Sequence, residues 1–172
     1  MKLTRIIILF ISSLCCTAVA GEYPIYTLDF DRYGPVKIGM HEKEAIKIFK
    51  GNLSTPLIPG QKPEPCHYLY PNGKNFNLGF MVEDGLVTRI DIYDKNISTT
   101  KGIKIGDSVE KVKNLYGRNL EIKPHFYIGK SGNYLKIKLG NGLGYVFETD
   151  AGKVTTFRSG KFSSISYVEG CL

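Results

Sequence analysis

Three histidines and one pair of aspartates are the residues that could transfer protons or assist a nucleophile. His41, His67 and His125 are far apart in the chain, and no nucleophile-elbow, HExxH, phosphate-loop or dinucleotide motif lies near any of them. Asp29 and Asp31 would share one face of a strand, where two carboxylates can bind a cation or exchange protons; a solvated edge is the competing interpretation. We expect a non-enzymatic protein with no cofactor and no metal site. A small secreted hydrolase using Asp29, Asp31 or His67 is the minor alternative.

Two of the four cysteines, Cys66 and Cys171, lie outside the N-terminal apolar stretch. In an oxidising compartment such a pair most simply forms one disulfide, here closing a loop of about 105 residues. The chain-entropy model assigns such a loop up to ~4–5 kcal/mol of stabilisation. The alternative is a metal-binding or catalytic thiol, but Cys66 has only the adjacent His67 as a partner in the sequence. We therefore predict a Cys66–Cys171 disulfide.

The N-terminus has the pattern of a secretory signal peptide. Lys2 and Arg5 precede a short apolar run, and small residues up to Ala20 favour cleavage before residue 21. We expect a periplasmic or secreted protein. Lipidation of Cys15 or Cys16 is the alternative, although neither cysteine directly follows a small residue.

The net charge is positive but spread along the chain. It is +7 over the whole sequence and falls to about +5 once Lys2 and Arg5 leave with the leader. There is no basic run or arginine-rich arm, so a solvated surface or weak attraction to anionic membrane surfaces, glycans or an acidic protein are the competing interpretations. We expect no nucleic-acid partner, and a monomer.

A short motif occurs twice, first as VKIG at 36–39 and again as IKIG at 103–106. When the chain is aligned with itself so that position 36 falls on position 103, ten positions over 36–94 are identical, where composition alone would give roughly three or four. We therefore predict an α+β fold of two tandem repeats, each a short helix followed by an antiparallel three-stranded meander, with the helices on one face of the sheet. The predicted segments are a signal peptide (1–20), a lead-in (21–35), repeat one (36–98) and repeat two with a C-terminal strand (99–172), the mature part forming one compact domain.

Periodicity and turn residues place the elements. We expect helices over about 40–49 and from an Asp107 N-cap, in a capping box with Glu110, to Gly117. Residues 54–66 and 121–133 read as loops, the second carrying His125, Phe126 and Tyr127 as either a binding tip or a cover for the core. Strands are expected near 66–71, 76–82, 86–93, 134–139, 143–149 and 153–158, with a last one over 163–171 at a sheet edge.

Alternation along the strands divides the side chains between two faces of the sheet. One face should lie under the helices. The other can remain open to water, and its tyrosine, arginine and methionine content is typical of protein-recognition surfaces; a solvated sheet with incidental aromatics is the alternative. The predicted partner-binding face consists of His67, Leu69, Met81, Arg89, Asp91, Tyr93, Tyr134, Lys136, Lys138 and Arg158.

The segments KIGMHEKEAIKIFKG and KIGDSVEKVKNLYGR resemble the motif of the SmpA/OmlA, or BamE-like, envelope family. The order of helix and three-stranded meander, used twice in an exported chain, is similar to β-lactamase inhibitor proteins. That second resemblance implies two repeats whose joined sheet forms a concave partner-binding face. The chain departs from both patterns, because the envelope lipoproteins carry a lipid-modified cysteine and the inhibitors carry a disulfide within each repeat.

These observations favour an exported protein-binding module that binds one protein partner, as an inhibitor or an immunity-type protein of the bacterial periplasm. A structural or assembly component of the cell envelope is the alternative. The two interpretations differ in a simple observable, because an inhibitor should be soluble and bind one enzyme, whereas an envelope component should fractionate with membrane or cell wall.

Overall fold

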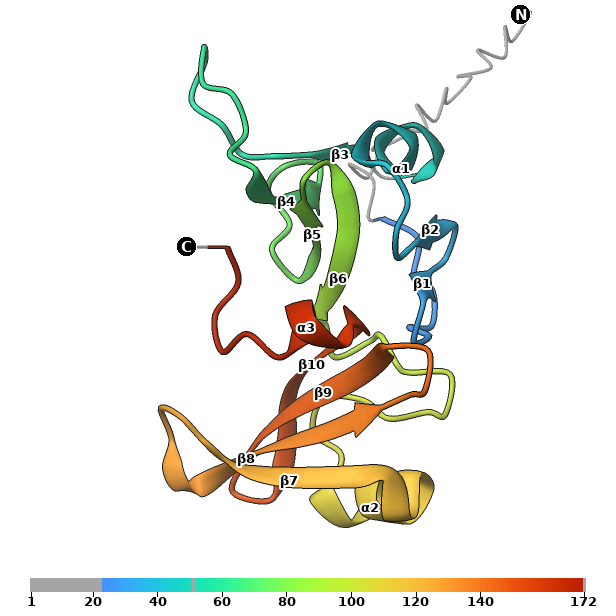
Figure 1. Cartoon of the computed structure of the whole chain (residues 1–172), viewed down its shortest axis with the longest axis vertical. Coiled ribbons are helices and arrows are strands. Elements are labelled where there is room, and N and C mark those ends of the chain that lie inside the picture. The colour runs from blue at the N-terminus through green and yellow to red at the C-terminus, as the bar shows by residue number, and fades with distance from the viewer. Residues whose placement is uncertain (1–22, 51, 172) are drawn as a thin grey trace, which may run out of the picture.

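The computed structural model describes residues 23–50 and 52–171 (Figure 1). The predicted signal peptide, including Cys15 and Cys16, lies outside the described residues. The described chain is α+β, with one large antiparallel sheet, a two-stranded hairpin and short helices. None of its helices is long and apolar enough to cross a membrane.

The elements follow one another as a helix and strands, then a second helix and further strands. In chain order they are β1 (Arg32–Tyr33), β2 (Val36–Lys37), α1 (Glu42–Ile48), β3 (Leu53–Ser54), β4 (Cys66–Pro71), β5 (Leu78–Glu83), β6 (Leu86–Ile92), α2 (Val109–Tyr116), the 3-10 helix η1 (Gly117–Asn119), β7 (Leu120–His125), β8 (Gly129–Lys138), β9 (Leu143–Asp150), β10 (Lys153–Lys161) and α3 (Phe162–Ile165).

One eight-stranded sheet runs through both halves of the chain, in the order β3-β4-β5-β6-β10-β9-β8-β7. The halves meet where β6 pairs antiparallel with β10, and Asp91 lies opposite Arg158 at the centre of that pairing. Whether the two halves share a sheet could not be decided from the sequence. Their strands do form one continuous sheet.

The main core lies between this sheet and the layer formed by α1, α2 and the β1–β2 hairpin. Ala45 and Phe49 from α1, and Val112 and Tyr116 from α2, are buried there. In Figure 1, α1 and the β1–β2 hairpin lie on one side of β6 and α3 lies on the other. The sheet is therefore covered on both faces near its centre, and the second cover is the C-terminal segment.

The two halves of the chain use the same local contacts at positions that are 67 residues apart in the sequence. The N–H of Gly39 donates to the Val87 carbonyl at 2.7 Å, and that of Gly106 donates to Val154 at 2.8 Å. The N–H of Glu42 donates to Gly85, and that of Val109 to Gly152, both at 3.0 Å. Gly39 and Gly106 have φ of +86° and +92°, which non-glycine residues rarely adopt.

The helices begin and end close to the predicted positions, with one correction. Gly117 ends α2 as predicted, but the N-cap is Ser108, whose hydroxyl accepts from the Lys111 N–H at 3.2 Å. Asp107 instead accepts from the Lys104 N–H at 2.7 Å and pairs with the Lys111 ammonium at 2.8 Å. The carboxylate that was predicted to cap the helix therefore fixes the turn before it.

Most strands confirm the predicted positions, and β4 matches its predicted range of 66–71. The predicted loop over 121–133 is wrong in part, because residues 120–125 form the edge strand β7, paired with β8. The predicted last strand over 163–171 is wrong as well. That segment begins with α3, which packs across the sheet, because its carbonyls bind two arginine side chains rather than a neighbouring strand.

A glycine to alanine change at residue 160 tests the β6–β10 junction. Gly160 has φ of +143°, and an added Cβ would lie 2.9 Å from the Arg89 Cα and still closer to the Thr88 carbonyl oxygen. We expect Gly160→Ala to lower the free energy of unfolding by about 2–3 kcal/mol, measured by urea titration. Gly140→Ala is the control, since Gly140 has no atom within 4 Å of an added Cβ. Equal stability of both variants would contradict the close approach of the two strands.

Candidate functional site

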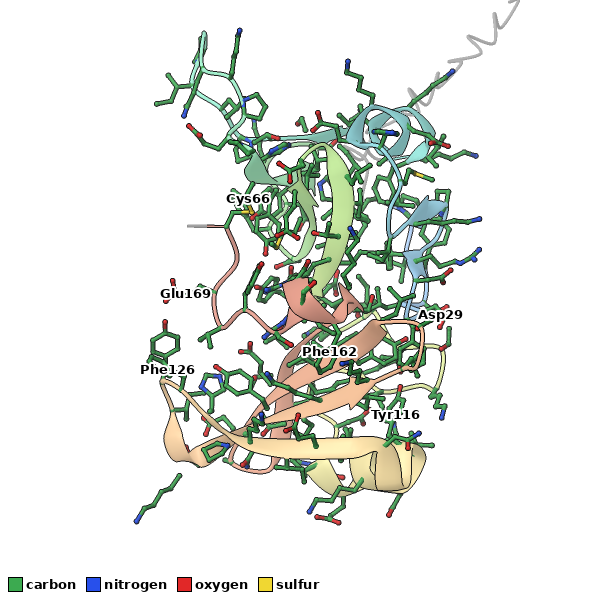
Figure 2. All side chains as sticks on the ribbon, in the orientation of Figure 1. Asp29, Cys66, Tyr116, Phe126, Phe162 and Glu169 are labelled. Atoms are coloured by element: carbon green, nitrogen blue, oxygen red, sulfur yellow. A yellow bond between two sulfur atoms is a disulfide. The ribbon has the colours of Figure 1, made fainter. Side chains whose placement is uncertain are left out.

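Residues 162–171, called the strap here, cross the sheet face opposite α1 and α2 (Figure 2). The strap starts with α3, and the N–H of Phe162 donates to the Gly142 carbonyl at 2.8 Å. Ile165 joins a small apolar cluster with Tyr134 and Val146, against which Phe162 packs. These contacts fix the first turn of the strap over the second half of the sheet.

Arg89 on β6 binds backbone carbonyls of the strap. Its Nε and Nη2 donate to the Asp91 carboxylate at 2.7–2.9 Å. Its Nη1 faces three strap carbonyls, those of Ser164 and Tyr167 at 3.4 Å and that of Glu169 at 3.2 Å. The guanidinium group is thus surrounded by acceptors, which a buried cation requires.

Arg158 on β10 repeats this arrangement on the neighbouring strand. Its Nε donates to the Ile165 carbonyl at 2.8 Å and its Nη2 to the Tyr167 carbonyl at 3.2 Å. Its Nη1 forms an ion pair with Glu148, whose other oxygen lies 3.2 Å from the His125 Nε2. The two arginines therefore supply the donors that the carbonyls at the end of a short helix lack.

Burial and the Arg89–Asp91 pair set the protonation of this cluster. Burial alone would lower the pKa of Arg89, but the Asp91 carboxylate more than offsets it, so the net shift is upward. Burial also raises the pKa of Tyr68, whose hydroxyl donates to Asp91 at 3.1 Å. Tyr93 is half-exposed, but partial desolvation and the nearby Asp91 carboxylate raise its pKa to about 12. Both phenols therefore keep their protons at ordinary pH. The cluster is a fixed set of charges and donors.

The predicted disulfide between Cys66 and Cys171 is confirmed. It ties the far end of the strap to the first residue of β4, across a sequence separation of 105 residues. The strap is therefore held by apolar packing at α3, by two arginines in its middle and by a covalent bond at its end.

A groove of about 660 Å³ runs between the end of the strap and the tip of the β7–β8 hairpin. Phe126 and Tyr127 at the hairpin tip are 73% and 61% exposed, and Tyr167 on the strap is 47% exposed. The Tyr127 hydroxyl donates to the Glu169 carboxylate, so the tip and the strap are joined. The remaining lining residues are Cys66, Glu83, Val168, Gly170 and Cys171.

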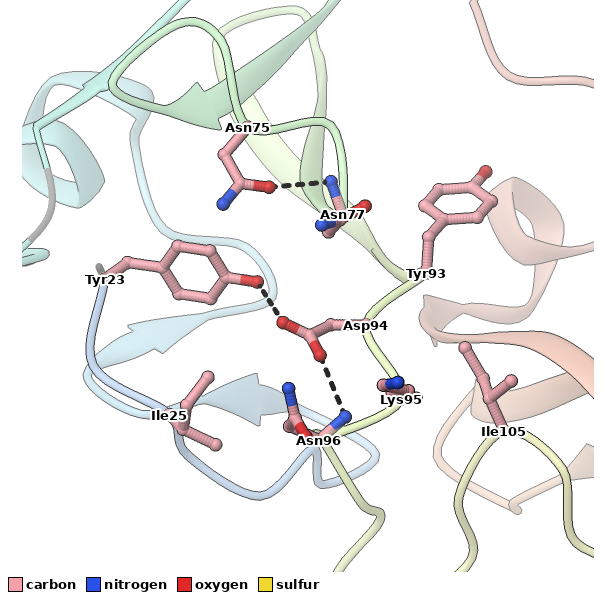
Figure 3. A pocket seen from close by; sticks show the side chains of 9 residues that line it. All are labelled: Tyr23, Ile25, Asn75, Asn77, Tyr93, Asp94, Lys95, Asn96 and Ile105. Carbon is pink, nitrogen blue, oxygen red and sulfur yellow. Dashed lines mark hydrogen bonds between the residues drawn. The ribbon is translucent and has the colours of Figure 1, made fainter.

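A second concave site, of about 730 Å³, has Tyr93 in its lining and shares no lining residue with the groove (Figure 3). It is formed where the chain enters β5 and leaves β6, together with the first described residues. Its lining is rich in amide side chains. The lining residues are Tyr23, Ile25, Asn75, Asn77, Tyr93, Asp94, Lys95, Asn96 and Ile105.

Two residues of the predicted partner-binding face, His67 and Leu69, lie on the opposite face. Leu69 pairs with Phe80, and both belong to the core under the helices. His67 pairs with Val82 and its Nε2 lies 2.9 Å from Glu42 of α1. The prediction was wrong because alternation orders residues within one strand, whereas the register between strands decides which sets share a face.

The rest of the predicted face has the right orientation, but it is not open. Arg89 and Arg158 are each 3% exposed and Asp91 is 1% exposed, because the strap covers them. Met81 and Tyr134 are buried, Lys136 is half-buried, and Tyr93 and Lys138 remain exposed. The binding surface predicted from alternation is therefore largely an internal one.

The histidines and aspartates considered as catalytic candidates do not form a common site. His67 Nδ1 lies 2.7 Å from the Glu64 carbonyl, so both of its ring nitrogens have partners. His125 accepts the Tyr127 N–H at 3.2 Å, while Asp31 pairs with Arg32 at 3.0 Å. Hydrogen bonds from Arg32 lower the pKa of Asp31, although burial acts in the opposite direction. Among the described residues no group of three acidic, histidine or cysteine side chains is suited to a metal ion.

Sequence reasoning missed the strap and its groove, although two signals pointed to them. Phe126 and Tyr127 were recognised as a candidate binding tip, and the disulfide already required Cys171 to lie beside Cys66. The disulfide places the C-terminal end of the strap beside the first residue of β4. It does not show that the hairpin tip and the strap meet.

Comparison with family models and with curated proteins found no match. Among solved structures, the chain is similar to the crystal structure of the uncharacterized protein yfeY from Escherichia coli, with a TM-score of 0.49 and 16% sequence identity. The similarity covers 78% of this chain and 99% of that chain. A likeness of this degree carries no argument about function.

Replacing Arg89 with lysine tests how the strap is held. A lysine keeps the charge but lacks the planar fork that binds Asp91 and the strap carbonyls together. We expect Arg89→Lys to lower the free energy of unfolding by about 2–4 kcal/mol and to speed amide exchange in residues 162–171. Arg32→Lys, at an exposed arginine next to Asp31, should change neither quantity. Unchanged strap exchange in Arg89→Lys would show that the guanidinium group does not hold the strap.

Proposed function

We propose that the protein is an exported, non-enzymatic module that binds another protein through the groove between the strap and the β7–β8 hairpin. The observation that carries this proposal is the exposure of Phe126, Tyr127 and Tyr167 around one concave surface. Large apolar side chains clustered at a rigid surface are typical of protein-binding sites.

The lining of the groove indicates what part of a partner it binds. Among the described residues that line it, the charged side chains are Glu83 and Glu169, although the chain as a whole is basic. An extended segment with one large apolar residue and a nearby lysine or arginine would fill the apolar surface and pair with these carboxylates. A partner segment rich in acidic residues would be repelled.

The supports of the groove favour binding without rearrangement. One wall is fixed by the Cys66–Cys171 disulfide and by the carbonyl contacts of Arg89 and Arg158. The other wall is a hairpin tip whose His125 ring stacks on Tyr134 at 4.4 Å between ring centroids. A site that is already ordered loses little conformational entropy on binding.

We also propose that the fold consists of two copies of one unit, a helix and a three-stranded meander, as in the BamE-like and β-lactamase-inhibitor families. The equivalent hydrogen bonds of Gly39 and Gly106 support this, as do those of Glu42 and Val109. Asp91 and Arg158 are equivalent positions of the two repeats and lie opposite each other, so an approximate two-fold axis would pass between them. In this proposal the protein acts outside the cytoplasm, as an inhibitor or immunity-type protein of the periplasm.

A peptide selection tests the proposed groove even while the natural partner is unidentified. The purified oxidised protein is used to select binders from a displayed library of random decapeptides. We expect enrichment of peptides with a large apolar residue close to lysine or arginine. Their affinity, measured by fluorescence polarisation, should fall about tenfold or more in Phe126→Ala, because this side chain is the most exposed large apolar one in the groove.

Phe76→Ala is the matched control, since Phe76 is also an exposed phenylalanine but is not part of the groove. It should leave peptide affinity unchanged. Selected peptides that bind Phe126→Ala as well as the unmodified protein, or that share an acidic consensus, would contradict the proposed site.

A further inference from the structure

The cleft in Figure 3, called the asparagine cleft here, is separate from the peptide groove and has a different chemistry. Residues 75–77 and 93–96 form two of its walls, at the point where β5 begins and β6 ends. Tyr23 and Ile25 form a third wall, and Ile105 borders it from the second half of the chain. The sheet, the first described segment and the second half of the chain thus all contribute to its surface.

Hydrogen bonds within the chain fix the walls of the asparagine cleft. The Asn75 side-chain oxygen accepts the Asn77 N–H at 3.1 Å, and the Tyr93 N–H donates to the Asn77 carbonyl at 2.8 Å. Asp94 accepts the Tyr23 hydroxyl at 2.9 Å and the Asn96 N–H at 2.8 Å, one on each carboxylate oxygen (Figure 3). The positions of the side chains that line the cleft are therefore set before any ligand binds.

Polar groups directed at the cleft remain available. Within the described residues, the side-chain amides of Asn77 and Asn96 form no hydrogen bond, and Asn75 uses only its oxygen. Each free amide has donor and acceptor atoms close together, which suits a hydroxyl group that also donates and accepts. Beside these amides lie apolar surfaces, those of Ile25 and the half-exposed Tyr93 ring.

The charges of the cleft exclude other ligand classes. Lys95 and Asp94 balance each other, and both oxygens of Asp94 already accept hydrogen bonds, so neither a strong anion nor a metal cation is favoured. A purely apolar ligand would bury the amides without partners, which costs free energy. The volume of about 730 Å³ is within the usual range for small-ligand sites.

From these features we propose that the asparagine cleft binds an uncharged oligosaccharide. Its hydroxyl groups bind the amides of Asn75, Asn77 and Asn96, and the C–H faces of its rings pack on Tyr93 and Ile25. This site does not depend on the proposed protein partner. A protein with both sites would bind a polypeptide in the groove and a glycan in the asparagine cleft, which share no lining residue.

Titration of the isotope-labelled protein with two probes tests the site, using chitotetraose and cellotetraose in separate NMR experiments. We expect saturable shifts of the amide signals of residues 75–77 and 93–96, with a dissociation constant of ~1 mM or lower for at least one probe. The two probes distinguish an N-acetylated sugar from a plain glucan, and binding of either supports the proposal. Absence of saturable binding by both probes would overturn it.

A double variant, Asn77→Ala with Asn96→Ala, removes the free amides but keeps the backbone hydrogen bonds of the walls. It should weaken sugar binding at least tenfold while leaving the thermal unfolding midpoint unchanged. Asn114→Ala, at an exposed asparagine on α2, is the control and should bind as the unmodified protein does. Full binding by the double variant would overturn the proposal. Phe126→Ala should also bind sugar normally, so that failure of the peptide groove and failure of this site can be told apart.

Discussion

Two buried guanidinium groups determine how the C-terminal part of this chain must lie. Arg89 and Arg158 project from adjacent strands on the sheet face that the larger helices leave uncovered, and a buried cation without acceptors is strongly destabilising. Each arginine directs part of its N–H groups to one carboxylate, Arg89 to Asp91 and Arg158 to Glu148. The carbonyls of Ser164, Ile165, Tyr167 and Glu169 satisfy the rest, and they lie at or beyond the end of the short helix α3, where carbonyls need donors from outside the helix. The strap carbonyls thus supply acceptors for the arginine side chains, and the arginines supply donors for these carbonyls.

The same arrangement produces the groove proposed to bind a protein. Because the arginines hold the middle of the strap against the sheet and Cys171 is bonded to Cys66, the strap ends beside the hairpin tip that carries Phe126. The exposed aromatic residues there belong to segments that these contacts hold in place, and not to a free terminus. The asparagine cleft depends on different contacts, chiefly those of Asp94. It is therefore proposed as a site that does not depend on the groove.

Local patterns in the sequence predicted a large part of this fold. The positions of most strands, the approximate positions of both helices and the disulfide follow from alternation, spacing and cysteine count. The Asp107 cap was wrong because a serine one residue later is better placed, and His67 was placed on the wrong face because register between strands is a tertiary property. The strap was missed for a similar reason. Nothing in its short sequence shows that its carbonyls will meet Arg89, from the first half of the chain, and Arg158, from the strand just before it.

Hydrogen exchange at the arginine side chains, followed by NMR on the unmodified oxidised protein, tests the central claim most directly. The account predicts that the Nε protons of Arg89 and Arg158, which donate to Asp91 and to the Ile165 carbonyl, exchange much more slowly than that of the exposed Arg32. Equal exchange at all three side chains would mean that water reaches the guanidinium groups freely. The strap would then not close this face of the sheet, and the groove would lose the fixed wall on which its proposed function depends.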